Sequence, residues 1–209
     1  MNHEKAHAFY ELIATGLMAV ATVATAWCAY QSTLWSGVEE FQLHDAEALN
    51  REALALRSYG TNLTMLDVSI FTNYTNAHMS GNTVLSAFYR ERFSPRLAPA
   101  FAAWELELRN NPSTAPRHPF EMKQYVVPQY VRADSINAVY HSSVENARNS
   151  NGFSEDFILL TVIYASVLFF GGITSNIRTL STKRILVVVS TVSLLLALAW
   201  MFTIPLPPH

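Results

Sequence analysis

Three stretches of the chain, residues 12–30, 157–175 and 185–204, contain no Asp, Glu, Lys or Arg. Each is about 20 residues long, the length at which an α-helix crosses the roughly 30 Å hydrocarbon core of a bilayer. Backbone N–H and C=O groups in lipid have no water to bond, so a lone span must pair them internally and is therefore helical. The stretches predict an all-α membrane protein with three transmembrane helices.

The rest of the composition fits this class. Only 14% of the 209 residues are charged, against about 25% in soluble domains. The net charge of −2 lacks the basic footprint of a nucleic-acid-binding protein, so we expect no nucleic-acid partner. A cleaved signal peptide is the alternative for the first stretch, because Ala24-Thr25-Ala26 fits a cleavage site. Glu4 and Glu11 argue against it, since a signal peptide begins with net positive charge.

The distribution of Lys and Arg predicts the orientation, because these residues favour the cytoplasmic ends of spans. Lys5 precedes the first span, and Arg178, Lys183 and Arg184 lie in or beside the loop between the second and third. The opposite side has only Arg148 close to a membrane end. Residues 1–11 and 176–184 are therefore predicted to be cytoplasmic, and residues 31–156 and the tail 205–209 extracytoplasmic, in a bacterial inner membrane.

Aromatic residues mark the outer end of the first span. Trp27 and Tyr30 have rings that bury in lipid and polar tips that stay in water, which is typical of the membrane interface. Trp35 follows and is assigned to the same interface, two helical turns further out. We therefore expect Trp35→Glu to be milder than Trp27→Glu. Core packing of these residues is the alternative interpretation.

The extracytoplasmic domain, residues 31–156, is predicted to be helical. Apolar positions keep helical spacing from Leu34 to about Met79, with Phe41 and Leu66 on the predicted packing stripe and a possible bend at Gly60. The segment 80–82 ends this helix, and 83–93 forms a short one. Ser94-Pro95 is a helix start, the proline-rich 110–120 is a loop, and a return helix leads into the second span.

Carboxylate and imidazole groups recur on facing positions of the outgoing and returning helices. If residues 31 and 156 both mark the membrane surface, antiparallel pairing places residue n near 187 − n. This register brings His44 near His141. Ligands on facing helices of a bundle can hold a transition metal. The candidate metal ligands are Glu40, His44, Glu47, His141 and Glu145. The alternative is a solvated face with weak ion pairs.

The segment 88–104 combines aromatic rings with arginines, the residues that dominate protein-protein interfaces. Its candidate docking residues are Phe88, Arg92, Phe93, Phe101 and Trp104. The alternative is that these rings form the small core that closes the outer domain.

Small residues recur along one side of the first span. Thr15, Ala19, Thr22 and Ala26 would let a second helix approach closely, and close approach supports helix association in lipid. A homo-oligomer or another membrane protein is therefore the expected partner, with lipids around it. Ala19→Leu is expected to loosen this packing more than Ala24→Leu. A pore lined by Thr15, Thr22 and Thr25 is the second functional hypothesis, and a metal enzyme the third.

Sequence motifs of nucleophilic, P-loop or zinc enzymes are absent, so we expect neither an enzyme nor a cofactor. The stretches AYQSTLWSGVE, RFSPRLAPAFAAW, HPFEMKQYV and LFFGGITSNIR resemble a group of small bacterial integral membrane proteins without an assigned activity. The resemblance implies one span, a helical outer domain and a C-terminal hairpin of spans in the inner membrane. It implies no catalytic residue. The leading functional hypothesis is a structural or interaction protein whose outer domain binds a partner or senses the envelope.

The orientation can be tested by thiol labelling. With Cys28 changed to Ser, a Cys introduced at Asn110 should react with an impermeant reagent added outside intact cells, because the residue is extracytoplasmic. A Cys introduced at Thr179 should stay unlabelled until the cells are opened. The opposite labelling pattern would contradict the orientation.

Overall fold

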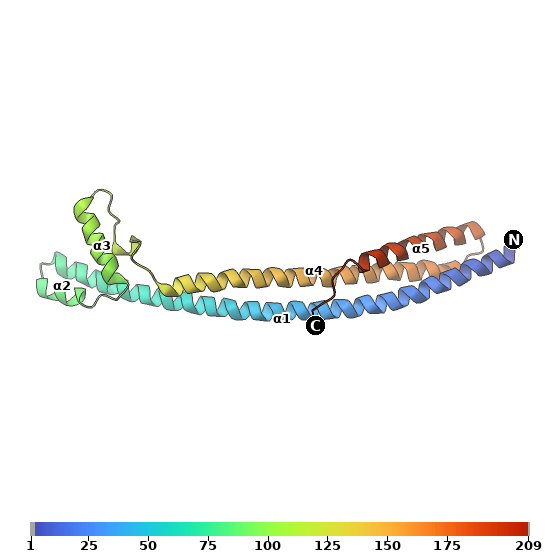
Figure 1. Cartoon of the computed structure of the whole chain (residues 1–209), viewed down its shortest axis with the longest axis horizontal. Coiled ribbons are helices and arrows are strands. Elements are labelled where there is room, and N and C mark those ends of the chain that lie inside the picture. The colour runs from blue at the N-terminus through green and yellow to red at the C-terminus, as the bar shows by residue number, and fades with distance from the viewer. Residues whose placement is uncertain (1–2, 209) are drawn as a thin grey trace. The chain divides into compact units, whose positions relative to one another are not determined.

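The computed structural model describes residues 3–208, and the regular elements in this range are all helices, with no strand (Figure 1). The elements are α1 (His3–Met79), α2 (Thr83–Arg90), α3 (Leu97–Asn110), the 3₁₀ turn η1 (Pro119–Glu121), α4 (Pro128–Asn176) and α5 (Leu180–Met201). The predicted segments 1–11 and 205–209 each include residues outside the described range. Helices α1, α4 and α5 are each long and apolar enough to cross a membrane. The predicted stretches 12–30 and 157–175 lie within α1 and α4, whereas 185–204 extends three residues past the end of α5 at Met201.

The chain divides into two compact units. The first unit contains residues 1–45 and 142–209, and the second contains residues 46–141. Helices α1 and α4 contribute to both units, and α1 continues through Gly60 without a break. Each unit is built on an antiparallel pair formed by a part of α1 and a part of α4.

The first unit buries its helices around small residues. Every seventh residue of α1 faces inward, at Ala14, Ala21, Cys28 and Trp35. This seven-residue repeat is that of a coiled coil, and small side chains in it let helix backbones approach closely. The partners in the core come from α4 and α5 and include Phe157, Leu160, Tyr164, Val167, Leu194 and Ala197.

In the second unit, α1 has a seven-residue repeat of its own, with Ala46, Ala53, Gly60, Asp67 and Tyr74 all buried. A Cβ atom at Gly60 would lie 2.7 Å from Cε1 of Tyr130, so glycine is what allows that ring to lie against α1. The buried stripe is thus not the predicted one. Phe41 and Leu66, which the apolar spacing placed on the packing side, are 76% and 66% exposed.

The predicted antiparallel register agrees with the pairing inside each unit. In the first unit, Ser154 shares a hydrogen bond of 2.9 Å with Ser32, next to the residue that the register expects. In the second unit, Arg132 donates to Glu52 over 3.1 Å, within about three residues of the expected position. The membrane boundaries assumed at residues 31 and 156 therefore gave nearly the correct alignment of α1 and α4.

The end of α1 and the start of α2 have explicit capping. Gly81 has φ +73°, and the Asn82 N–H donates to the Ala77 carbonyl over 3.0 Å. This is the glycine-based ending common at helix C-termini. Asn82 then caps α2, because its side-chain oxygen accepts from the Leu85 N–H. Helix α3 begins at Leu97, two residues after the predicted first position at Pro95, and the Ser94 hydroxyl accepts from the Leu97 N–H over 3.1 Å.

Trp35 lies in the core of the first unit. Its exposed fraction is 6%, its ring packs on Phe153 at 4.7 Å, and its indole N–H donates to the Pro205 carbonyl over 3.1 Å. Trp27 and Tyr30 are 44% and 56% exposed. The assignment of Trp35 to the same interface as these two residues is therefore wrong, because the segment after α5 folds back over it.

The burial of Trp35 reverses the expected order of the tryptophan variants. Trp35→Ala should lower the free energy of unfolding by about 3–5 kcal/mol, since it removes a buried ring and a hydrogen bond. Trp27→Ala should cost clearly less because almost half of its surface is already exposed. Thermal unfolding of the purified variants measures the difference. Equal losses would contradict the placement of Trp35 in the core.

Candidate functional site

The candidate metal ligands remain on the surface. Nε2 of His44 lies 3.8 Å from Oε1 of Glu40, and both side chains are largely exposed. The other three have local partners on their own helices: Glu47 with Arg51, His141 with Asn137 and Glu145 with Arg148. Nowhere in residues 3–208 do three or more His, Cys, Asp or Glu side chains gather in a way that could hold a metal ion. The described structure therefore gives the metal hypothesis no assembled site.

The predicted small-residue face of the first span points away from the core of the first unit. Thr15, Ala19, Thr22 and Ala26 are all exposed. The Thr15 and Thr22 hydroxyls donate to the carbonyls of Glu11 and Met18 on their own helix, over 2.9 and 2.8 Å. This face contributes nothing to packing within the described chain and is free to contact lipid or another helix.

Ala24 belongs to the buried side of α1 instead. Its exposed fraction is 6%, and it is part of the core of the first unit. A leucine at this position would have to displace α4 or α5, so Ala24→Leu cannot serve as the mild control for Ala19→Leu. The expected order of these two variants is therefore wrong for packing within the chain.

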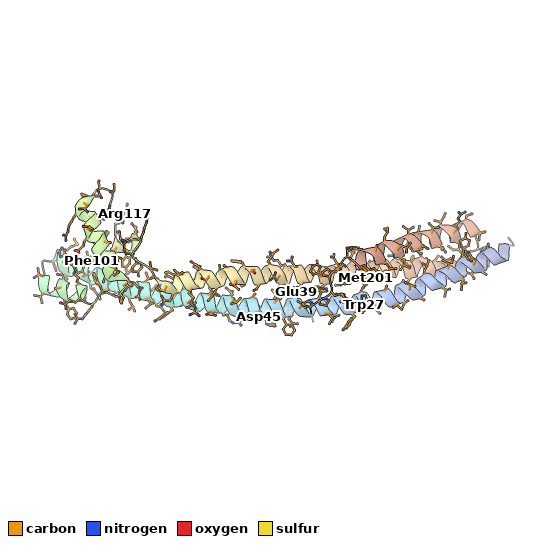
Figure 2. All side chains as sticks on the ribbon, viewed as in Figure 1. Trp27, Glu39, Asp45, Phe101, Arg117 and Met201 are labelled. Carbon is orange, nitrogen blue, oxygen red and sulfur yellow. The ribbon has the colours of Figure 1, made fainter. Side chains whose placement is uncertain are left out.

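Next to the small-residue face, α1 and α5 form an apolar groove of about 630 Å³. Trp27 of α1 and Met201 of α5 are among its lining residues (Figure 2). Ala19, Val23 and Leu198 also line it. Its lining offers almost no polar group, so the groove suits a hydrocarbon surface and no chemistry.

The rings of the predicted docking patch mostly form the core of the second unit. Phe101 is 2% exposed and packs edge-on against Phe93 at 5.0 Å and Tyr74 at 5.1 Å. Trp104 contacts Phe71 at 5.8 Å. The alternative stated for this segment, a small core that closes the outer domain, is what the structure shows for Phe93, Phe101 and Trp104.

Phe88 and Arg92 alone remain a surface feature of the patch. Phe88 is 45% exposed, and the Arg92 guanidinium lies over its ring at 3.5 Å. Arg92 also donates to the Phe88 carbonyl over 2.9 Å. The pair lies beside a recess of about 410 Å³ that α1 and the α2–α3 segment line together.

Asp67 is a buried carboxylate that sequence reasoning missed. It is 2% exposed and sits in the seven-residue repeat that α1 shows in the second unit. Nε and Nη2 of Arg96 each lie 3.1 Å from its Oδ2, and the Tyr125 hydroxyl donates to the same oxygen over 3.0 Å. The three residues tie α1 to the start of α3 and to the segment before α4. The only signal in the sequence is the place of Asp67 in the repeat.

The pKa of the Tyr125 hydroxyl reflects the buried, negatively charged surroundings that it shares with Asp67. Burial raises the pKa of the Tyr125 hydroxyl above its usual value, and the Asp67 carboxylate raises it further. The neutral phenol is the form that can donate to Asp67. A raised pKa in the folded state stabilises the fold below about pH 10, and this contribution is lost as the pH rises through the folded-state pKa.

Comparisons with protein families, curated proteins and solved structures find no match to this chain. The resemblance noted in the sequence therefore stays a prediction. Nothing is carried to this chain from a relative.

The Asp67 contacts predict a large effect for a small change. Asp67→Ala should lower the free energy of unfolding by about 3–5 kcal/mol, because it leaves the Arg96 charge without its buried partner. The control is Glu52→Ala, which removes a carboxylate from an exposed pair with Arg132 and should cost about 1 kcal/mol or less. Chemical unfolding of both variants measures the two losses in the free energy of unfolding. Similar losses would show that the Asp67 group does not stabilise the second unit.

Proposed function

We propose that the protein is an integral membrane interaction protein whose second unit docks a partner outside the cytoplasm. Its spans are the apolar stretches of α1, α4 and α5, which supply the required length and composition. The orientation follows from the excess of Lys and Arg around the N-terminus and the α4–α5 connection. The second unit, which carries most of the chain's charged residues, then lies in the extracytoplasmic space.

Helix α2 carries the observation that supports docking. Its apolar residues point outward and a polar residue points inward: Val84 is 81% exposed, whereas Ser86 is 7% exposed. Leu85 and Phe88 add to the exposed apolar surface, and Met79 at the end of α1 does too. A helix in water normally buries its apolar side. An exposed apolar cluster with polar surroundings is typical of a protein interaction site.

The partner is a second copy of this chain or another membrane protein. The exposed small-residue face on α1 supports association between spans as well, since close packing is what holds helices together in lipid. The sites on α1 and α2 could act together, because a contact inside the membrane raises the effective concentration of the contact outside it.

The two other hypotheses have less support. Selective pores are usually lined by charged rings or backbone carbonyls, whereas this face offers only threonine hydroxyls whose hydrogens already go to carbonyls of their own helix. A metal enzyme needs ligands that converge, and Glu40 and His44 are an exposed pair on one helix.

Site-specific photo-crosslinking tests the proposal. A photoreactive phenylalanine analogue at Val84 in whole cells should give a discrete cross-linked product, because this position is the most exposed apolar one on α2. The same analogue at Ser58, an exposed position on α1, is the matched control and should give none. A product of twice the monomer mass identifies a second copy, and another mass identifies another protein. Equal or no cross-linking at the two positions would contradict docking through α2.

A further inference from the structure

A cavity of about 420 Å³ opens in the second unit between α1, α3 and the loop after α3. It is separate from the exposed face of α2 on which the proposed function rests. Phe101 and Arg117, two of its lining residues, belong to α3 and to that loop (Figure 2). Its volume lies in the range of about 300–1,000 Å³ that small-molecule sites occupy.

The floor of the cavity is aromatic and held by contacts within the unit. Tyr74 and Phe101 meet edge-on at 5.1 Å with an interplanar angle of 81°. Trp104 lies 5.8 Å from Phe101, and its indole N–H donates to the Pro116 carbonyl over 2.7 Å. The indole donor is therefore already used, and Trp104 offers the cavity only its ring. A planar ring can enter such a site through further edge-to-face and stacked contacts.

Positive side chains outnumber negative ones at the cavity. Glu105 is the only carboxylate of its lining, and Nη2 of Arg90 donates to it over 2.7 Å. The Arg90 guanidinium also lies 5.1 Å from the centre of the Phe101 ring. Glu105 is thus neutralised from within the unit. Two guanidiniums, those of Arg109 and Arg117, also line the cavity.

Both guanidiniums are available to a ligand. Arg109 and Arg117 are exposed, and neither has an ion-pair partner among residues 3–208. The Arg117 backbone N–H donates to Glu121 over 3.3 Å, and the neighbouring Pro116 carbonyl is the acceptor for Trp104. These contacts hold the loop backbone against the aromatic floor, so the Cα atom from which the Arg117 side chain extends is fixed beside the cavity.

We propose that this cavity binds a small aromatic carboxylate, with its ring on the floor formed by Tyr74, Phe101 and Trp104 and its carboxylate between Arg109 and Arg117. A guanidinium presents two parallel N–H donors that match a carboxylate. A cationic ligand would face two positive charges and a carboxylate that Arg90 already occupies. A neutral ring would fill the floor but leave both guanidiniums without a counter-charge.

Two kinds of ligand carry an aromatic ring next to a carboxylate: a free aromatic acid, and the C-terminus of a peptide that ends in an aromatic residue. Binding of 3-phenylpropanoate and of N-acetylphenylalanine to the full chain in lipid nanodiscs, measured by saturation-transfer NMR with empty nanodiscs as the blank, separates them. Tighter binding of the first probe supports a free acid, and tighter binding of the second supports a peptide end.

The variants test the role of charge. Arg109→Gln with Arg117→Gln should weaken binding of the better probe at least about ten-fold, the loss expected for charge-assisted hydrogen bonds. Arg117→Gln alone should give a smaller loss. Arg51→Gln is the control, since Arg51 is an exposed arginine of the same unit paired with Glu47, and it should bind as the unchanged chain does.

The uncharged analogue 3-phenylpropanamide should bind the unchanged chain and the double variant equally weakly. The proposal is overturned if neither carboxylate binds above the blank, if the amide binds as tightly as the acids, or if the double variant keeps full affinity. Far-UV circular dichroism and the thermal midpoint should be unchanged in the double variant, because both arginines lie on the surface.

Discussion

Close approach of antiparallel helices through small side chains is the constraint on which the rest of the structure depends. In the first unit α1 presents Ala14, Ala21 and Cys28 at intervals of seven residues, and in the second it presents Ala46, Ala53 and Gly60. Small residues bury little apolar area each, so stability comes from many van der Waals contacts along the helices. The same kind of packing recurs in both units, and one long helix, α1, contributes to each of them.

The cost of this arrangement is that each unit needs other groups to complete it. In the first unit, a hydroxyl cluster of Ser32, Ser36 and Ser154 joins α1 to α4, and Trp35 holds the segment after α5. In the second unit, the repeat reaches Asp67, whose contacts fix Arg96 and Tyr125. Directional bonds of this kind specify one register of two helices, which small apolar side chains alone leave loosely defined.

Much of the architecture could be predicted because it follows from uninterrupted patterns. The apolar stretches, the helix ending at residues 80–82 and the Ser94-Pro95 start are local signals, and the register followed from membrane boundaries assumed at residues 31 and 156. The buried stripe could not be predicted in the same way. The apolar pattern placed the large residues Phe41 and Leu66 on the packing side. A close helix pair instead buries alanine and glycine. The buried contacts of Asp67 could not be predicted either, because its partner Arg96 lies 29 residues away in sequence.

The candidate sites show why a residue type alone does not define a role. Arg90 and Arg96 come from the same arginine-rich segment as Arg92, yet both are bound to carboxylates of their own unit, Glu105 and Asp67. Arg109 and Arg117 attract less notice in the sequence, but they keep their charge without an internal partner among the described residues. The same holds for rings: Phe101 is core, whereas Phe88 is surface. Which arginines pair inside the second unit therefore depends on where the fold places Glu105 and Asp67, and not on how densely arginines occur in the sequence.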